Sequence, residues 1–281
     1  MKSIKLLVLL MILNTSNVAG IVIRHDVSDE QYFAKQSDFP PLATLYNIGT
    51  HGTLIHPEWV LTAAHVGFCM EPGRKIKIGD QIVPIAKRFN HHKYQLDQEH
   101  DIALIKLATP ITDVEPAELY ANTDEKGMVT WFIGAGGTGT GDQGQTINYN
   151  ENNGQLRKAK NKITDVTDTD IVFIFEKGDE GEPLEGVSGN GDSGGPAFIK
   201  KGDKYQLIGV SSRADSLIYD IGEYGVTEKY ARVSSYLDWI SRVMSAKSDA
   251  EIADITTQNR FLQDDLKIHP IDKVCNYLEI K

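Results

Sequence analysis

The stretch Ile102-Ala103-Leu104-Ile105-Lys106-Leu107 is a short apolar run with the residue types that favour a strand. Two similar runs precede it, Trp59-Val60-Leu61 and Lys75-Ile76-Lys77-Ile78, and Gly, Pro, Asp and Asn separate the three. Short strands at this close spacing predict an all-β fold, either a sandwich or a barrel.

The second half of the chain repeats this pattern. Its apolar runs lie at residues 129–133, 156–166, 171–175, 197–200 and 205–210. Two β modules of about a hundred residues each are therefore expected, the first at residues 21–125 and the second at residues 126–247. Helical periodicity is clear only near the end, where Val233, Tyr236, Leu237, Ile240 and Val243 recur every three or four residues. This periodicity predicts one C-terminal helix over residues 235–246.

The composition limits the classes of protein that are possible. The chain of 281 residues has 41% hydrophobic and 24% charged residues, which excludes disordered, collagen-like and low-complexity classes. It carries 29 Lys and Arg against 39 Asp and Glu, a formal net charge of −10. No stretch concentrates positive charge enough to offset this balance, so nucleic acid is not an expected partner. The core must come from apolar packing, since two cysteines cannot form a disulfide scaffold.

The N-terminus has the three-part pattern of a secretory signal. Two lysines lie in the first five residues, an unbroken apolar run follows at residues 6–13, and small and polar residues fill 14–20. The apolar run is far shorter than the roughly 20 residues of a membrane-spanning helix, and no later segment is long enough either. Val18 and Gly20 suit signal peptidase, so we expect removal of residues 1–20 and a new N-terminus at Ile21. The mature protein is expected to be secreted or periplasmic, with no membrane span.

Three short motifs carry residues suited to one chemistry. The segment Leu61-Thr62-Ala63-Ala64-His65 ends a strand in a histidine among small residues, and Asp101 precedes the apolar run at 102–107. A serine lies in the glycine-rich turn Gly189-Asn190-Gly191-Asp192-Ser193-Gly194-Gly195-Pro196. Amide hydrolysis through an acyl-enzyme needs a hydroxyl, a base, a carboxylate that orients the base, and N–H donors for the oxyanion. We predict His65, Asp101 and Ser193 as catalytic residues, and the N–H groups of Gly191 and Ser193 as the oxyanion hole.

The ordered motifs T-A-A-H, D-I-A-L and G-D-S-G-G-P resemble those of the trypsin/chymotrypsin-like serine peptidases. The resemblance covers residues 21–246 and implies one peptidase domain of two packed antiparallel Greek-key β-barrels with a C-terminal helix. It also implies an exported serine endopeptidase, expected to be a monomer, that acts on proteins or peptides without a cofactor. A catalytically silent binding module on the same fold is the alternative, and the same triad would also permit hydrolysis of small esters.

The resemblance implies supporting roles for further residues. The family buries its N-terminal ammonium group against the aspartate before the nucleophile, an arrangement that Ile21 and Asp192 match, although the usual Gly-Gly after the first two residues is missing. Ser212 matches the serine that hydrogen-bonds the catalytic aspartate. The tryptophan that usually follows is Arg213 here, so this part of the substrate cleft, with Ala214, is expected to be more polar.

The S1 pocket, which takes the side chain before the scissile bond, is equivocal. The resemblance puts Val187 at the pocket floor, where it offers no charge for a basic side chain. It puts Glu228 in place of a glycine on the pocket wall, where a carboxylate would attract Lys or Arg. The other interpretation is that Glu228 points to solvent. The preference at P1, apolar or basic, therefore stays open.

The cysteines and the end of the chain depart from the family. The disulfides that usually brace the histidine loop and the S1 pocket are missing. Cys69 and Cys275 would both lie in an oxidising compartment if the protein is exported, so a bridge between them is expected. Residues 248–281 form a C-terminal extension that the family does not require. Loose helical spacing of Ile252, Ile255, Leu262 and Leu266 favours an amphipathic appendage packed on the barrels, and a sorting or partner-binding tail is the alternative.

Two patterns suggest other functions and fail on context. The glycines at residues 134–139 fit the G-x-G-x-x-G pattern of dinucleotide-binding proteins, but no helical periodicity follows them. Six histidines lie between residues 51 and 100, yet none has the spacing of a zinc motif. We therefore expect neither a nucleotide nor a metal site.

Overall fold

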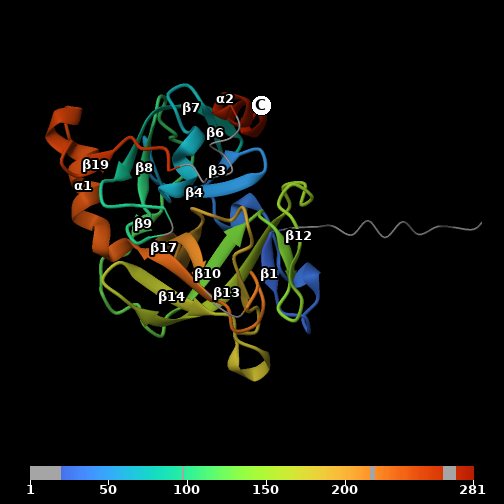
Figure 1. The fold of residues 1–281 in the computed structure, drawn as a ribbon. Coiled ribbons are helices and arrows are strands. Elements are labelled where there is room, and N and C mark those ends of the chain that lie inside the picture. The colour runs from blue at the N-terminus through green and yellow to red at the C-terminus, as the bar shows by residue number, and fades with distance from the viewer. Residues whose placement is uncertain (1–19, 97, 216–218, 262–269) are drawn as a thin grey trace, which may run out of the picture.

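The computed structural model describes residues 20–96, 98–215, 219–261 and 270–281. Its strands close into two antiparallel barrels of six strands each, stacked one above the other in Figure 1. This confirms the predicted all-β fold and the double barrel that the family resemblance implied.

The first barrel is built from the apolar runs of the N-terminal half. Its strands are β3 (Leu42–Tyr46), β4 (Gly49–His56), β5 (Trp59–Thr62), β6 (Lys75–Ile78), β7 (Gln81–His91) and β8 (Ala103–Leu107). Pairing of β7 with β8 closes the ring. In β6, Ile76 and Ile78 are buried while Lys75 and Lys77 are exposed, the alternation expected of a strand with one face in the core.

The second barrel repeats this plan in the C-terminal half. Its strands are β10 (Val129–Gly134), β13 (Leu156–Val166), β14 (Asp170–Ile174), β16 (Pro196–Lys201), β17 (Lys204–Asp215) and β18 (Thr227–Arg232). Pairing of β10 with β13 closes the ring. Short strands between the barrels and at their rims are β9 (Glu118–Leu119), β11 (Thr138–Thr140), β12 (Gly144–Ile147) and β15 (Gly186–Val187).

The first strands of the chain lie on the second barrel, although the predicted division counted them with the first. β1 (Ile21–Ile23) pairs with β11 and β15, and β2 (Phe33–Ala34) pairs with β13. The N-terminal segment thus reaches the loops that follow β10 and β15. The boundaries at residues 125 and 247 stay a prediction.

The predicted C-terminal helix is present as α1 (Leu237–Ser245), with a 3₁₀ turn at Val233–Tyr236 before it. The extension packs on the barrels, where Ile252, Ile255 and Leu278 are buried in the main hydrophobic cluster. It forms a 3₁₀ turn at Asp249–Ile252, strand β19 (Thr256–Thr257) and helix α2 (Ile271–Leu278), because pairing with the end of β7 draws residues 256 and 257 into the first barrel. Leu262 and Leu266 lie outside the described residues. The remaining 3₁₀ turns are at Asp29–Gln31, Gln36–Asp38, His65–Cys69 and Gly178–Glu180.

The expected disulfide between Cys69 and Cys275 is confirmed. It joins the 3₁₀ turn after β5 to α2 across 206 residues, with the two Cα atoms 5.3 Å apart. In the part of the chain that the structure describes, no helix has the length and apolar character to cross a membrane.

Candidate active site

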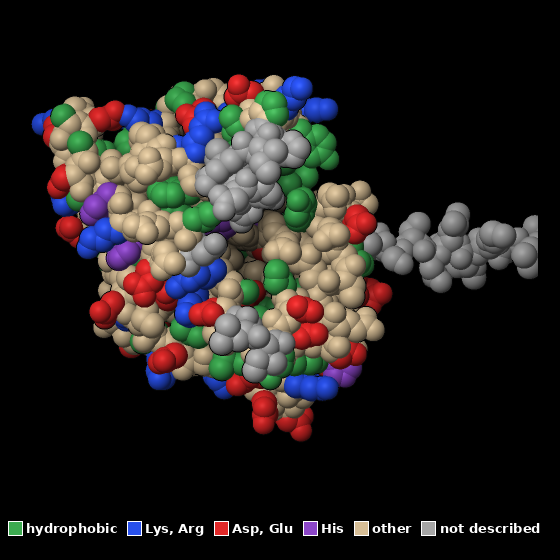
Figure 2. Space-filling view, viewed as in Figure 1, with side chains coloured by type: hydrophobic (Ala, Val, Ile, Leu, Met, Phe, Trp, Pro, Cys, Tyr) green, Lys and Arg blue, Asp and Glu red, His purple; other side chains and the backbone are tan. Residues whose placement is uncertain are grey.

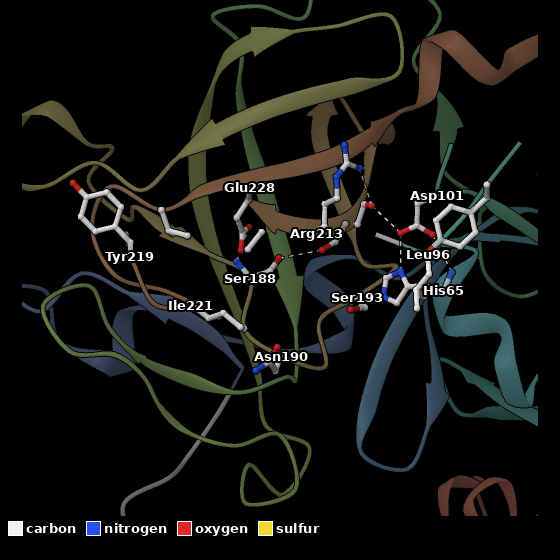
Figure 3. Close-up of a pocket in the computed structure, with 16 residues that line it drawn as sticks. His65, Leu96, Asp101, Ser188, Asn190, Ser193, Arg213, Tyr219, Ile221 and Glu228 are labelled. Atoms are coloured by element: carbon white, nitrogen blue, oxygen red, sulfur yellow. Dashed lines mark hydrogen bonds and ion pairs between the residues drawn. The ribbon is translucent and has the colours of Figure 1, made fainter. Parts of the chain in front are cut away.

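The three residues predicted as catalytic line one cavity of about 330 Å³ between the barrels (Figure 3). His65 begins the 3₁₀ turn after β5, Asp101 precedes β8, and Ser193 lies in the loop before β16. The ends of two first-barrel strands, β5 and β8, therefore meet a loop of the second barrel at this cavity.

The carboxylate of Asp101 holds His65 at two atoms. His65 Nδ1 lies 2.7 Å from Asp101 Oδ2, and the His65 backbone N–H donates to Oδ1 at 2.9 Å. Ser212 Oγ donates to Oδ2 at 2.7 Å, as the family resemblance implied. Asp101 is only 3% exposed, so water does not compete for these bonds. A carboxylate acceptor at Nδ1 selects the tautomer with its proton there, and Nε2 then keeps the lone pair of a base.

Small side chains and a turn bring these two residues together. Ala63 and Ala64 are fully buried, so the backbone around the imidazole packs closely. His100 has a φ of 63°, a left-handed conformation that turns the chain immediately before Asp101. The Tyr236 hydroxyl lies 3.2 Å from His100 Nδ1 and holds this turn. The sequence analysis pointed to the small residues before His65, but not to the turn at His100 or its contact with Tyr236.

The loop that carries Ser193 depends on glycine. Gly191 and Gly194 have φ values of 93° and 75°, and a Cβ atom at Gly194 would collide with Thr62 and with the His51 carbonyl. The His51 N–H donates to the Ser193 carbonyl at 2.8 Å, which ties the loop to β4. Within the described chain, neither the Gly191 nor the Ser193 N–H donates to a protein acceptor. Both donors thus remain for a substrate oxygen, as an oxyanion hole requires.

Asp192 is buried under this loop and is 2% exposed. Its carboxylate accepts N–H groups from Gly136 at 2.6 Å, Gly189 at 2.9 Å and Ile21 at 3.1 Å. Burial raises its pKa to about 6, against the opposing effect of the three N–H donors. The structure therefore places Ile21 and Asp192 together, in the arrangement that the resemblance implied.

His51 is a buried neighbour of Asp192 that the sequence analysis did not single out. Its Nε2 lies 3.9 Å from Asp192 Oδ1 and accepts the Ala135 N–H at 3.0 Å. Burial lowers the pKa of His51 to about 4, so the ring is neutral at neutral pH. His51 and Asp192 are consequently not an ion pair at neutral pH, and His65 remains the predicted base.

Val187 does not form the pocket floor that the resemblance suggested. It is fully buried on β15, where it pairs with Val22 of β1 and packs with Phe175 and Val226. In this segment, the first residue that lines the cavity is the next one, Ser188. Val187 fails to reach the cavity because the N-terminal strand covers it.

Glu228 points into the cavity and not to solvent (Figure 3). It is 4% exposed, and its Oε2 accepts the Ser188 N–H at 3.0 Å. Burial, together with the nearby charge of Asp192 and against the opposing bonds from Ser188, raises the pKa of Glu228 to about 8. The carboxyl group is therefore mostly protonated at neutral pH.

Hydroxyl groups surround this carboxyl, and sequence reasoning missed them. Ser188 Oγ is hydrogen-bonded to the Tyr230 hydroxyl and lies 3.4 Å from Ser211 Oγ. Ser188 directly follows Val187, so the motif alignment could have found it. Tyr230 and Ser211 come together only through the pairing of β17 with β18.

Ser212, Arg213 and Ala214 also line the cavity, as expected. Arg213 is held by an ion pair of 2.7 Å with Asp170, which is 3% exposed. Asp170 begins β14, and nothing in its sequence context indicated this role. The cleft wall is polar here, as expected, but its cation is already paired.

The glycines at 134–139 have a structural role in this site. A Cβ atom at Gly134 or Gly136 would collide with the Asp192 carboxylate. They lie at the end of β10 and the start of β11, with no helix between them. Among the described residues, no three His, Cys, Asp or Glu side chains gather in a way that could hold a metal ion.

Comparison with known proteins agrees with this geometry. Residues 30–240 match the family described as Trypsin, and this range includes His65, Asp101 and Ser193. The chain is 30% identical over 218 residues to a tryptase from Mus musculus, a match that covers 67% of this chain and 76% of the mouse protein. The chain belongs to the trypsin family of serine peptidases.

Proposed function

We propose that this chain is an exported serine endopeptidase that cleaves peptide bonds through an acyl-enzyme. The observation that carries the proposal is the contact of Asp101 with His65 and Ser212, in the same cavity as Ser193. A histidine oriented by a buried carboxylate beside a serine is the arrangement that activates a hydroxyl.

The proposed reaction has two halves. His65 Nε2 accepts the proton of Ser193 Oγ as that oxygen attacks the scissile carbonyl, and Asp101 stabilises the imidazolium that forms. The N–H groups of Gly191 and Ser193 bind the oxyanion. The intermediate collapses when His65 gives its proton to the leaving amine, and water then repeats these steps on the acyl-serine to release the acid.

Labelling of the nucleophile tests this proposal. An organophosphorus fluoride should modify Ser193, and Ser193→Ala should abolish both the labelling and all but residual peptide hydrolysis. Ser241→Ala, an exposed serine on α1, is the matched control and should behave like the unmodified protein. Full peptidase activity in Ser193→Ala would contradict the proposal.

For the S1 cavity, we infer a preference for Lys or Arg at P1. Glu228 and Ser188 provide polar groups inside the cavity, and Tyr219, Ile221 and Val226 line it with apolar surface. A long side chain with an apolar stem and a cationic end matches both features. Its cation would favour ionised Glu228, because an opposite charge at short range lowers a carboxyl pKa.

For export, we propose that residues 1–20 are a signal peptide and that cleavage after Gly20 completes the active site. Residues 1–19 lie outside the described residues. Ile21 has a φ of 69°, a strained conformation for a β-branched residue, and its nitrogen already lies beside Asp192. Cleavage would end the φ constraint and convert that nitrogen into an ammonium group facing a carboxylate.

A further inference from the structure

A second cavity of about 460 Å³ lies on the other side of the catalytic pair. It shares His65 and Ser193 with the cavity that contains Glu228, but it extends toward the first barrel and the C-terminus. Figure 2 shows a hollow between the two halves of the molecule, with hydrophobic side chains beside it. No function described so far uses this second cavity.

Much of its lining is apolar, and four of the described lining residues come from outside the family match at residues 30–240. Helix α2 contributes Val274, Tyr277 and Leu278, and Phe261 comes from the segment after β19. Tyr277 is 68% exposed, an unusual state for a large ring. No Lys, Arg, Asp or Glu is among the described residues that line the cavity.

Helix α2 is fastened beside the catalytic histidine. The disulfide from Cys275 reaches Cys69, the last residue of the 3₁₀ turn that begins with His65. At the C-terminal end of the helix, the Asn47 N–H donates to the Leu278 carbonyl at 2.9 Å, and its side-chain amide donates to the Tyr277 carbonyl at 2.6 Å. These tethers make α2 a fixed wall of the cavity.

The path of a substrate indicates which of its residues would enter this cavity. A peptide with its P1 side chain beside Glu228 has its scissile carbonyl at Ser193, so the chain must continue past Ser193 on the opposite side. We propose that α2 forms the wall of a subsite for large apolar side chains in the first two residues after the scissile bond, P1′ and P2′. This inference rests on the proposed peptidase activity. Burial of such side chains against Tyr277 and its neighbours would remove apolar surface from water on both partners.

Two kinds of substrate with the same residues before the scissile bond test the subsite. One is a p-nitroanilide, which has no residue after the scissile bond. The other is a set of fluorescence-quenched peptides with Leu or Phe, or with Ser, at P1′ and P2′. We expect kcat/KM to be about tenfold higher for the Leu and Phe peptides than for the Ser peptides, the scale of discrimination by an apolar pocket. Equal values for the two sets would overturn the inference.

Variants on one helix then locate the effect. Tyr277→Ser should reduce the preference for Leu or Phe several-fold, and Tyr277→Phe should retain it. Asn276→Ala is the control, because this exposed neighbour on α2 does not line the cavity, and it should leave both substrate classes unchanged. An unchanged preference in Tyr277→Ser, or an equal fall for anilide and peptides, would contradict a role of α2 in this subsite.

Binding to the inactive variant separates this inference from the proposed function. In Ser193→Ala, calorimetry should show tighter binding of the Leu or Phe peptide than of the Ser peptide, by about the same factor. Hydrolysis of neither substrate class by the unmodified enzyme would overturn the peptidase proposal. Equal affinity of the two peptides for Ser193→Ala would overturn the subsite.

Discussion

The two cavities on either side of Ser193 differ in the origin of their walls. The cavity with Glu228 is formed largely by second-barrel residues close to recognisable motifs, and it contains a buried carboxyl and hydroxyl groups. The other takes α2 and Phe261 from the C-terminal extension, and its described lining has no charged Asp, Glu, Lys or Arg. The family fold thus supplies the proposed catalytic residues and the cavity with Glu228, while an added segment supplies a wall of the other cavity.

Asp192 lies under the loop that carries Ser193, where the two cavities meet. Its substitution should lower activity on substrates of both cavities alike, with the largest expected effect after loss of a catalytic residue. Asp192→Asn removes the buried charge that faces Ile21, and one-sided loss of such a pair costs about 3 to 5 kcal/mol. We expect kcat/KM to fall by roughly two to four orders of magnitude for anilide and peptide substrates together. Asp203→Asn, at an exposed turn, is the control.

The contact of Ile21 with Asp192 can also be tested through the N-terminus. N-terminal sequencing of the exported protein should find Ile21 first, and a form with one additional residue before Ile21 should lose activity on both substrate classes. An extended form as active as the native one would show that the Ile21 ammonium is not needed.

The first cavity alone should respond to Glu228→Gln, which removes the charge at nearly constant volume. We expect kcat/KM for Lys or Arg at P1 to fall about tenfold or more, the scale of a charge-assisted hydrogen bond, with little change for Leu or Phe. Glu180→Gln, at an exposed position outside both cavities, is the matched control. An equal loss for all P1 residues would place the effect of Glu228 outside P1 recognition.

The pH dependence of the first cavity follows from the raised pKa of Glu228, about 8. A carboxyl group ionises as pH rises through its pKa, so the ratio of kcat/KM for Lys to that for Leu at P1 should increase from pH 7 to pH 9. Glu228→Gln should give a flat ratio over this range. A ratio that stays constant in the unmodified enzyme would contradict the assignment.

The smallest effect on catalysis is expected from the disulfide, and it should be confined to the second cavity. The double variant Cys69→Ser with Cys275→Ser should lose about 2 to 4 kcal/mol of unfolding free energy, measured by denaturant titration. It should lose part of the preference for apolar P1′ and P2′ residues, because the Asn47 contacts still hold one end of α2. Anilide hydrolysis should change little. A selective loss of anilide hydrolysis would contradict the claim that the disulfide acts only on the second cavity.

The predictable features share a physical cause. Strand alternation and the motifs around His65, Asp101 and Ser193 are local in sequence, so the fold, the composition of the catalytic cavity and α1 could be predicted. The contacts of Asp170 with Arg213 and of His51 with Ala135 join residues 43 and 84 positions apart, and no local pattern records them. Val187 was expected at the pocket floor, but β1 pairs with β15 and covers it, and this long-range pairing leaves no local pattern in the sequence.

The structure of the C-terminal extension also depends on contacts between residues far apart in the sequence, which local patterns do not record. Its weak apolar periodicity suggested an amphipathic appendage but not its parts, a strand that pairs with β7 and a helix, α2, bridged to Cys69. The bridge could be expected from the two cysteines and the compartment. The consequence, a helix beside His65, depends on where Cys69 lies in the folded barrel.

The most direct test of the central claim is a rapid-quench reaction with a peptidyl ester whose acyl group ends in Lys or Leu. Acid quenching before the steady state should trap one acyl group per enzyme molecule, and mass spectrometry should place it on Ser193. The adduct should accumulate further at low pH, because deacylation needs neutral His65. Product formation with no covalent adduct, or an adduct that persists in Ser193→Ala, would contradict the account.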